Sequence, residues 1–218
     1  MNRVHQRGPQ GVRGDRSSGS KFSNLTPFQP FYSATATVYA KYFKHFGDVD
    51  MPLIQIEPTH KDFVFPISVD DIRSTLMRIP RQFLLGIKAI LVPSGSKKQI
   101  AAMKNRFMHG EYWQSCIFLH PCPRGLMKRV YETVPNPTVV QTYTRAGATM
   151  VRRNTGVEIS FDPESLRRFY LRDVLIHEIG HHVAGPERAA SRQSESFAKW
   201  FASEYGYRLS PGGITAGR

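Results

Sequence analysis

The chain of 218 residues has only two cysteines, Cys116 and Cys122. Two cysteines cannot provide a disulfide framework for a chain of this length. His120 lies between them, but the spacing matches no standard zinc knuckle, and the apolar run CIFL is typical of a buried strand. We therefore expect both cysteines to be reduced and to have a structural role.

Long apolar runs are also missing from the sequence. No stretch approaches the about 18 consecutive apolar residues that a membrane-spanning helix needs. The N-terminus carries charge but lacks the apolar core of a classical signal peptide. We therefore expect no membrane partner and a cytoplasmic location.

Acidic residues are scarce: 17 Asp and Glu stand against 30 Lys and Arg, for a net charge of +13 at pH 7. Most of the excess lies in residues 72–172, which have 17 basic and five acidic side chains. Residues 173–218 have five of each. Such a surplus suggests a nucleic-acid partner, but net charge alone indicates only non-specific attraction.

Composition divides the chain into three parts. Residues 1–24 are rich in Gly, Ser and Arg, which predicts a disordered basic tail. Residues 25–68 mix proline with aromatic residues and form a predicted N-terminal extension, with a short helix over 35–46. Residues 69–218 show regular apolar periodicity, and we expect them to form one folded domain.

Within that domain, helices and strands are mixed. A helix capped by Asp70 or Asp71 is expected to run to about Gln82. Asp162-Pro163-Glu164 predicts the start of a helix that ends near Ala184, before Gly185-Pro186. This order predicts an α+β fold. Strands are expected at 87–93, 114–121, 138–144, 148–153 and 157–161, and further helices at 97–108 and 189–205.

The helix predicted to end near Ala184 contains the sequence His177-Glu178-Ile179-Gly180-His181. Residues four apart on a helix share a face, so the two imidazoles can take two corners of a tetrahedral Zn²⁺. Glu178 can then act as general base toward a water molecule that the metal activates. The pattern predicts one catalytic zinc per chain.

A catalytic zinc needs a third protein ligand. No histidine follows His182, so the sequence points to a carboxylate. The downstream candidates are Glu187, Glu195 and Glu204, of which we favour Glu195. Glu195 lies on the next predicted helix, on one stripe with the small residues Ala198 and Ala202, which allow two helices to approach closely.

HEIGHH followed by ExxAxxFA resembles the gluzincins, and in particular the small ImmA/IrrE-type metallopeptidases. The specific match covers residues 174–205. The resemblance implies a minimal zincin fold with a mixed sheet, zinc held by His177, His181 and Glu195, and Glu178 as catalytic base. The family often has Asp or Asn four residues after the ligand glutamate, where this chain has Lys199.

Zincins usually bind the substrate backbone along an edge strand before the active helix, and the candidate here is 157–161, with Val157, Glu158 and Ile159. An oxyanion donor is also expected. The candidates for it are Tyr205, Tyr207 and His182.

These patterns indicate two possible functions. The first is a zinc metalloendopeptidase (a hydrolase) that cleaves peptide bonds of a protein substrate, including an acidic or DNA-associated one. The alternative is a nucleic-acid-associated basic protein whose zinc site is structural or vestigial. The alternative is supported by basic residues at 97–106, 124–129 and 152–153, but no recognisable nucleic-acid-binding motif accompanies them.

Overall fold

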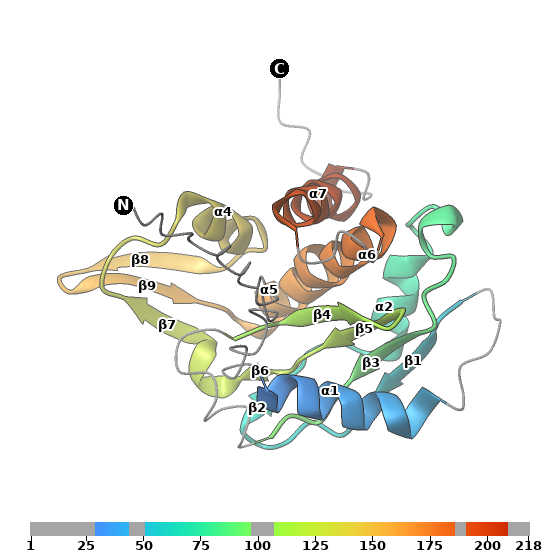
Figure 1. Cartoon of the computed structure of the whole chain (residues 1–218). Coiled ribbons are helices and arrows are strands. Elements are labelled where there is room, and N and C mark those ends of the chain that lie inside the picture. Colours follow the sequence, from blue (N-terminus) through green and yellow to red (C-terminus); the bar gives the residue numbers. More distant parts are fainter. Residues whose placement is uncertain (1–28, 44–50, 97–106, 186–190, 209–218) are drawn as a thin grey trace, which may run out of the picture.

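A computed structural model describes residues 29–43, 51–96, 107–185 and 191–208, with side chains from residue 36 onward. The fold is α+β, as predicted (Figure 1). The predicted tail and most of the helix expected over 97–108 lie outside the described residues.

A four-stranded sheet forms the centre of the molecule. Its strands are β1 (Leu53–Ile56), β3 (Ala89–Val92), β5 (Cys116–Leu119) and β4 (Gly110–Trp113), in this spatial order. The pairs β1–β3 and β3–β5 are parallel, whereas β4 runs antiparallel to β5 and forms one edge.

The central strands are apolar throughout because both faces of the sheet are covered. Ala89 and Leu91 of β3 face a cluster that includes Val38 of α1 (Gln29–Tyr42). Ile90 and Val92 point to the opposite face and belong to the main core.

Both cysteines are free thiols inside the protein, as predicted. Cys116 is fully buried on the α1 side of the sheet, and burial raises the pKa of its thiol to about 11. Cys122 is buried in the main core, where burial raises its pKa to about 12. Their role is therefore one of packing.

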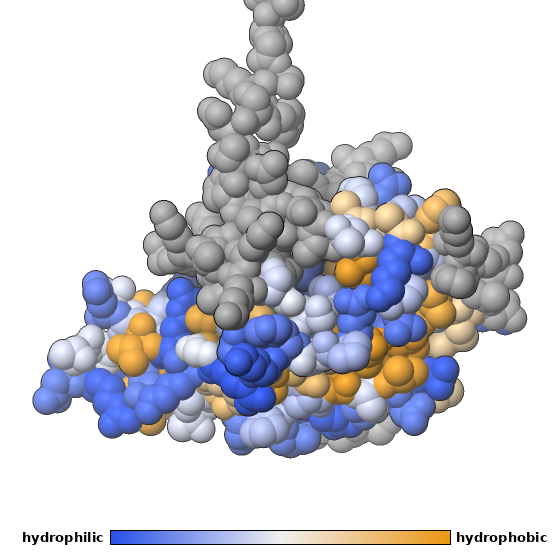
Figure 2. All heavy atoms as spheres, turned by 90° about the horizontal axis from the view of Figure 1, so that it is seen from below, coloured by the Kyte–Doolittle hydropathy of each residue, from blue (hydrophilic) through white to orange (hydrophobic). Residues whose placement is uncertain are grey.

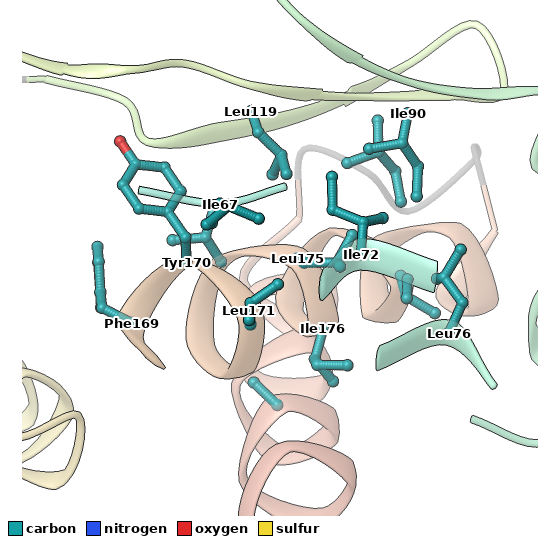
Figure 3. Close-up of a cluster of buried hydrophobic side chains, with 14 of the residues drawn as sticks. Ile67, Ile72, Leu76, Ile90, Leu119, Phe169, Tyr170, Leu171, Leu175 and Ile176 are labelled. Carbon is teal, nitrogen blue, oxygen red and sulfur yellow. The ribbon is translucent and has the colours of Figure 1, made fainter. Parts of the chain in front are cut away.

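The main core lies between the sheet and the helices on its other face. These are α2 (Val69–Leu76) and the segment around Tyr170 and Leu175 (Figure 3). A capping box opens α2, in which Ser68 is the N-cap and Asp71 the third helical residue, so the predicted cap at Asp70 or Asp71 is wrong by two or three residues.

The predicted helix over 163–184 is confirmed, with one irregularity. It begins as α5 (Pro163–Arg168), capped by the side chain of Asp162. It then widens into a π-helical segment, Phe169–Val174, before α6 (Leu175–Ala184). The second predicted helix is α7 (Arg192–Ser203), followed by a π-helical turn, Glu204–Arg208.

A three-stranded antiparallel sheet forms the other end of the molecule, with the order β7 (Lys128–Tyr131), β9 (Gly156–Ser160), β8 (Thr149–Arg153). The strand predicted at 157–161 is present as β9, but its predicted position at a sheet edge is wrong, because β9 is paired on both sides. The residues expected to bind substrate there, Val157, Glu158 and Ile159, lie in the centre of this sheet.

The strand predicted over 138–144 is also wrong, because these residues belong to helix α4 (Pro137–Arg145). Its β-branched residues favour a strand, but Asn136 and Pro137 favour a helix start. The Asn136 side chain accepts a hydrogen bond from the Thr138 N–H, which caps the helix. Local capping here outweighs the weak β-propensity of the segment.

Two early strands tie the predicted N-terminal extension to the domain. β1 pairs with β3, and β2 (Phe63–Val64) pairs with β6 (Cys122–Pro123). Residues 53–64 therefore belong to the folded domain, and the predicted boundary at residue 69 is wrong. Short 3₁₀ helices span Arg81–Phe83 and Arg124–Leu126.

The end formed by β7, β8 and β9 is largely hydrophilic when seen from the α1 side, with scattered apolar side chains (Figure 2). Two of its basic residues, Lys128 and Arg153, both pair with Glu158. Among the described residues of the whole chain, no helix is both long and apolar enough to cross a bilayer.

Candidate metal centre

Two histidines project from one face of α6, as their spacing predicts. The Nε2 atoms of His177 and His181 are 3.1 Å apart. Both residues lie in a helix whose other faces are packed into the main core through Leu175, Ile176 and Ile179. The core therefore holds both imidazoles in a defined position.

Glu195 of α7 completes the cluster. Its carboxylate oxygens lie 3.7 Å from Nε2 of His177 and 3.4 Å from Nε2 of His181. Of the other carboxylates considered, Glu204 forms an ion pair with Arg208, and Glu187 lies outside the described residues. The fold thus brings the favoured candidate to the two histidines.

The three side chains suit a zinc ion. Zn²⁺ binds imidazole nitrogen and carboxylate oxygen at about 2.0–2.2 Å, so tetrahedral ligand atoms lie roughly 3.4 Å apart. The candidate ligand atoms all lie within 4.8 Å of one another. The three distances between their nearest atoms, 3.1, 3.4 and 3.7 Å, are close to the separation that a tetrahedral zinc requires. Only these three described residues form such a cluster, which leaves a fourth position for substrate or water.

A hydrogen bond behind His181 orients its ring. Its Nδ1 atom is 2.8 Å from Oγ of Ser194, a residue that is 1% exposed. This contact leaves Nε2 directed at the cluster, as a metal-ligating histidine requires. Ser194 was not predicted from the sequence. The only available signal was its position next to Glu195.

Burial and hydrogen bonding at the cluster favour a neutral His177 and an ionised Glu195. Burial lowers the pKa of His177 to about 4, and the neighbouring His181 acts in the same direction. Glu195 opposes this shift, and Lys199 and Arg145 add smaller effects that lower the pKa. The hydrogen bond to His181 lowers the pKa of Glu195. Both protonation states are those that bind a metal.

Glu178 is buried beside the cluster. Burial raises the pKa of its carboxyl group to about 8, and repulsion from Glu195 and Glu111 adds to the effect. The backbone N–H of Tyr112 donates a hydrogen bond to this carboxyl group. A Cβ on Gly110 would lie 2.7 Å from Glu178 Oε1, so the close approach of β4 to this side chain requires glycine.

A cavity of about 540 Å³ contains all of these groups. Its walls come from strand β4, helix α4, the π-helical segment, α6 and α7. The lining residues are Met108, His109, Gly110, Glu111, Tyr112, Thr142, Arg145, Phe169, Asp173, Val174, His177, Glu178, His181, Glu195, Lys199 and Ala202.

The edge strand at this cavity is β4. One side of β4 pairs with β5, while Gly110, Glu111 and Tyr112 line the cavity. Sequence reasoning missed this strand because GEYW is short and only half-buried. The sequence favoured β9 instead because apolar and polar residues alternate clearly along it. This alternation reflects the packing of Val157 and Ile159 against Ala148.

None of the three predicted oxyanion donors lines the cavity. Tyr205 packs its ring against Phe83 and Phe201. Tyr207 donates its hydroxyl proton to Asp173. The ring nitrogens of His182 lie 2.8 Å from the Leu85 carbonyl oxygen and 2.9 Å from the Tyr112 hydroxyl. His182 therefore ties α6 to β4.

An ion pair between a partly buried arginine and a buried aspartate lines the cavity. Arg145 of α4 donates through Nε to Asp173 Oδ1 at 2.7 Å, and its guanidinium also lies over the Tyr207 ring. Burial raises the pKa of Asp173 to about 6, against the opposing effect of Arg145. These residues carry no motif, so only the folded chain brings them together.

Comparisons with protein-family models, curated proteins and solved structures give no match for this chain. Its function is therefore inferred from the geometry and chemistry of the cavity.

Proposed function

We propose that this protein is a zinc-dependent metalloendopeptidase. The observation that carries the proposal is the cluster of His177, His181 and Glu195 in one cavity with the buried carboxyl group of Glu178. Zinc bound there would polarise the scissile carbonyl and lower the pKa of a water molecule.

The protein's own residues then have separate tasks. The two histidines and Glu195 would hold the metal. Glu178, one residue after His177, takes a proton from the attacking water and passes it to the leaving amine. Its buried, weakly acidic carboxyl group suits both steps, because it can accept and release a proton near neutral pH.

Strand β4 is the element that would hold the substrate backbone. A peptide can add to a free sheet edge through main-chain hydrogen bonds. β4 is an edge strand, it lines the cavity, and it contacts Glu178 through Tyr112. A peptide added to β4 would therefore pass beside the general base.

Metal analysis and the Glu178→Gln variant test the proposal. We expect about one zinc per purified wild-type chain and proteolysis of unfolded protein substrates. Glu178→Gln should keep the zinc but lose at least about 100-fold of the activity, since general-base catalysis contributes that much or more. Wild-type protein that holds no stoichiometric zinc would rule out the proposal.

The wild-type protein and the Glu178→Gln variant also distinguish the peptidase from the alternative, a nucleic-acid-associated protein with a structural zinc site. A structural zinc has no need for a base or for an open coordination position. If wild-type protein held zinc but showed no proteolysis, and nucleic-acid binding fell steeply with salt, the nucleic-acid-associated alternative would be favoured.

A further inference from the structure

The two sides of the cavity differ in charge. In Figure 1, β4 lies below α6, whereas α7 lies above α6 and α4 to its left. The β4 side contributes the acid Glu111. The α4 and α7 side contributes two cations, Arg145 and Lys199, beyond the metal ligand Glu195.

The two cations differ in how they are held. Arg145 is 26% exposed and fixed by Asp173, which leaves part of its guanidinium facing the cavity. Lys199 is exposed on α7, one turn after Glu195. Lys199 forms none of the ion pairs found in the described parts of the chain, although its charge acts on Glu195 and helps to lower the pKa of that carboxyl group.

We propose that Lys199, with Arg145, forms a subsite for an acidic side chain of the substrate close to the scissile bond. The inference rests on the proposed peptidase function and names its substrate class. In an extended peptide along β4, alternate side chains point to opposite sides. Both sets stand perpendicular to the sheet, and those on the face that carries α6 would point toward the metal centre and the two cations.

Lys199 is the more informative residue to change, because Arg145 also has a structural role with Asp173. Lys199 is exposed and makes no described contact that the fold depends on, so Lys199→Gln should fold normally. An ion pair at such an exposed site changes affinity by about threefold. Reversal of the charge in Lys199→Glu should change it more, roughly tenfold, through repulsion.

The probes are short, labelled, otherwise neutral peptides that carry one Asp, scanned through every position, with Asn at the same position as the matched partner. Binding is measured by fluorescence anisotropy to zinc-loaded Glu178→Gln protein, which cannot hydrolyse them. We expect one position where Asp binds about threefold more tightly than Asn. Lys199→Gln should abolish this preference, and added salt should weaken it.

Lys61→Gln is the control, because Lys61 is an exposed lysine that does not line the cavity. It should leave the preference unchanged. Equal binding of Asp and Asn peptides at all positions overturns the inference, as does a preference that survives Lys199→Gln, or no peptide binding at all. A preference for Asp without wild-type proteolysis would support the subsite and refute the peptidase function.

Discussion

The two helices that hold the metal centre are built differently. α6 presents His177 and His181 from inside the core, with side chains 21% and 9% exposed. α7 presents Glu195, which is 51% exposed, from a helix with few buried residues. The histidines are therefore positioned by the hydrophobic core, whereas Glu195 is positioned by how α7 packs on α6.

Among the contacts made by α7 and the turn that follows it, three can be tested separately. In the middle, Gly180 of α6 lies against Ala198, where an added Cβ would be 2.8 Å from the Ala198 Cα atom. At the metal centre, Ser194 contacts His181. At the far end, Tyr207 binds Asp173. Each contact offers a way to test how far the third ligand depends on α7.

The largest effect is expected from the ligands themselves. Protein ligands together bind a zinc ion with a free energy of about 10–16 kcal/mol. Removal of one ligand, in His181→Ala or in Glu195→Ala, should therefore lower the zinc affinity on the order of 1000-fold. The metal-free proteins should differ. Glu195→Ala should stay within about 0.5 kcal/mol of wild type, while His181→Ala loses about 1–2 kcal/mol with its buried hydrogen bond.

Chelator competition gives the zinc affinities, and urea unfolding of metal-free protein gives the stabilities. If Glu195→Ala destabilised the metal-free protein as much as His181→Ala, the contrast between the two helices would be wrong.

Gly180→Ala should have the next largest effect. The new methyl group would push α7 away from α6 and destabilise the protein by about 1–3 kcal/mol. It should also weaken zinc binding, since Glu195 moves with α7. The matched control is Gly125→Ala, because a Cβ at Gly125 meets nothing within 4 Å. Urea unfolding measures both variants, and a more stable Gly180→Ala protein, as helix propensity alone predicts, would contradict the close contact.

Tyr207→Phe tests the hydrogen bond between Tyr207 and Asp173, and its effect on stability should depend on pH. The pKa of Asp173 is raised to about 6 in the folded protein, against about 3.9 in an unfolded chain. Folded protein therefore binds an extra proton between these values, and this residue's contribution to stability falls as pH rises from about 4 to 6. Tyr207 stabilises the ionised form, so its loss raises the pKa of Asp173 further.

Tyr207→Phe should thus cost about 2 kcal/mol at pH 8 and clearly less at pH 5, where Asp173 is protonated. Urea unfolding at both pH values measures this difference. An equal loss at both would show that the hydroxyl group does not favour the carboxylate.

The smallest effect is expected for Ser194→Ala. Loss of a hydrogen bond behind a ligand histidine lowers metal affinity about tenfold, which chelator competition can measure. Ser196→Ala on the same helix is the control, because Ser196 is exposed and does not line the cavity. Equal zinc affinity in the two variants would show that His181 is oriented without Ser194.

Local signals predicted much of this molecule. Asp162 and Pro163 marked the helix start, and the apolar runs around Ile90 and Ile117 marked buried strands. The predictions were wrong where neighbouring elements determine the structure of a segment. The position of β9 was wrong because a short segment does not reveal whether a strand has one neighbour or two. Helix α4 was predicted as a strand because the sequence does not show whether its helix cap outweighs the β-propensity of its residues.

The sequence by itself determined the spacing of His177, Glu178 and His181, because a helix places residues four apart on one face. It also limited the third ligand to a few carboxylates. Only the tertiary structure decided that Glu195 meets the histidines, that β4 provides the free edge, and that Arg145 and Lys199 line the same cavity. These contacts join residues far apart in the chain, so they depend on packing between elements rather than on any local pattern.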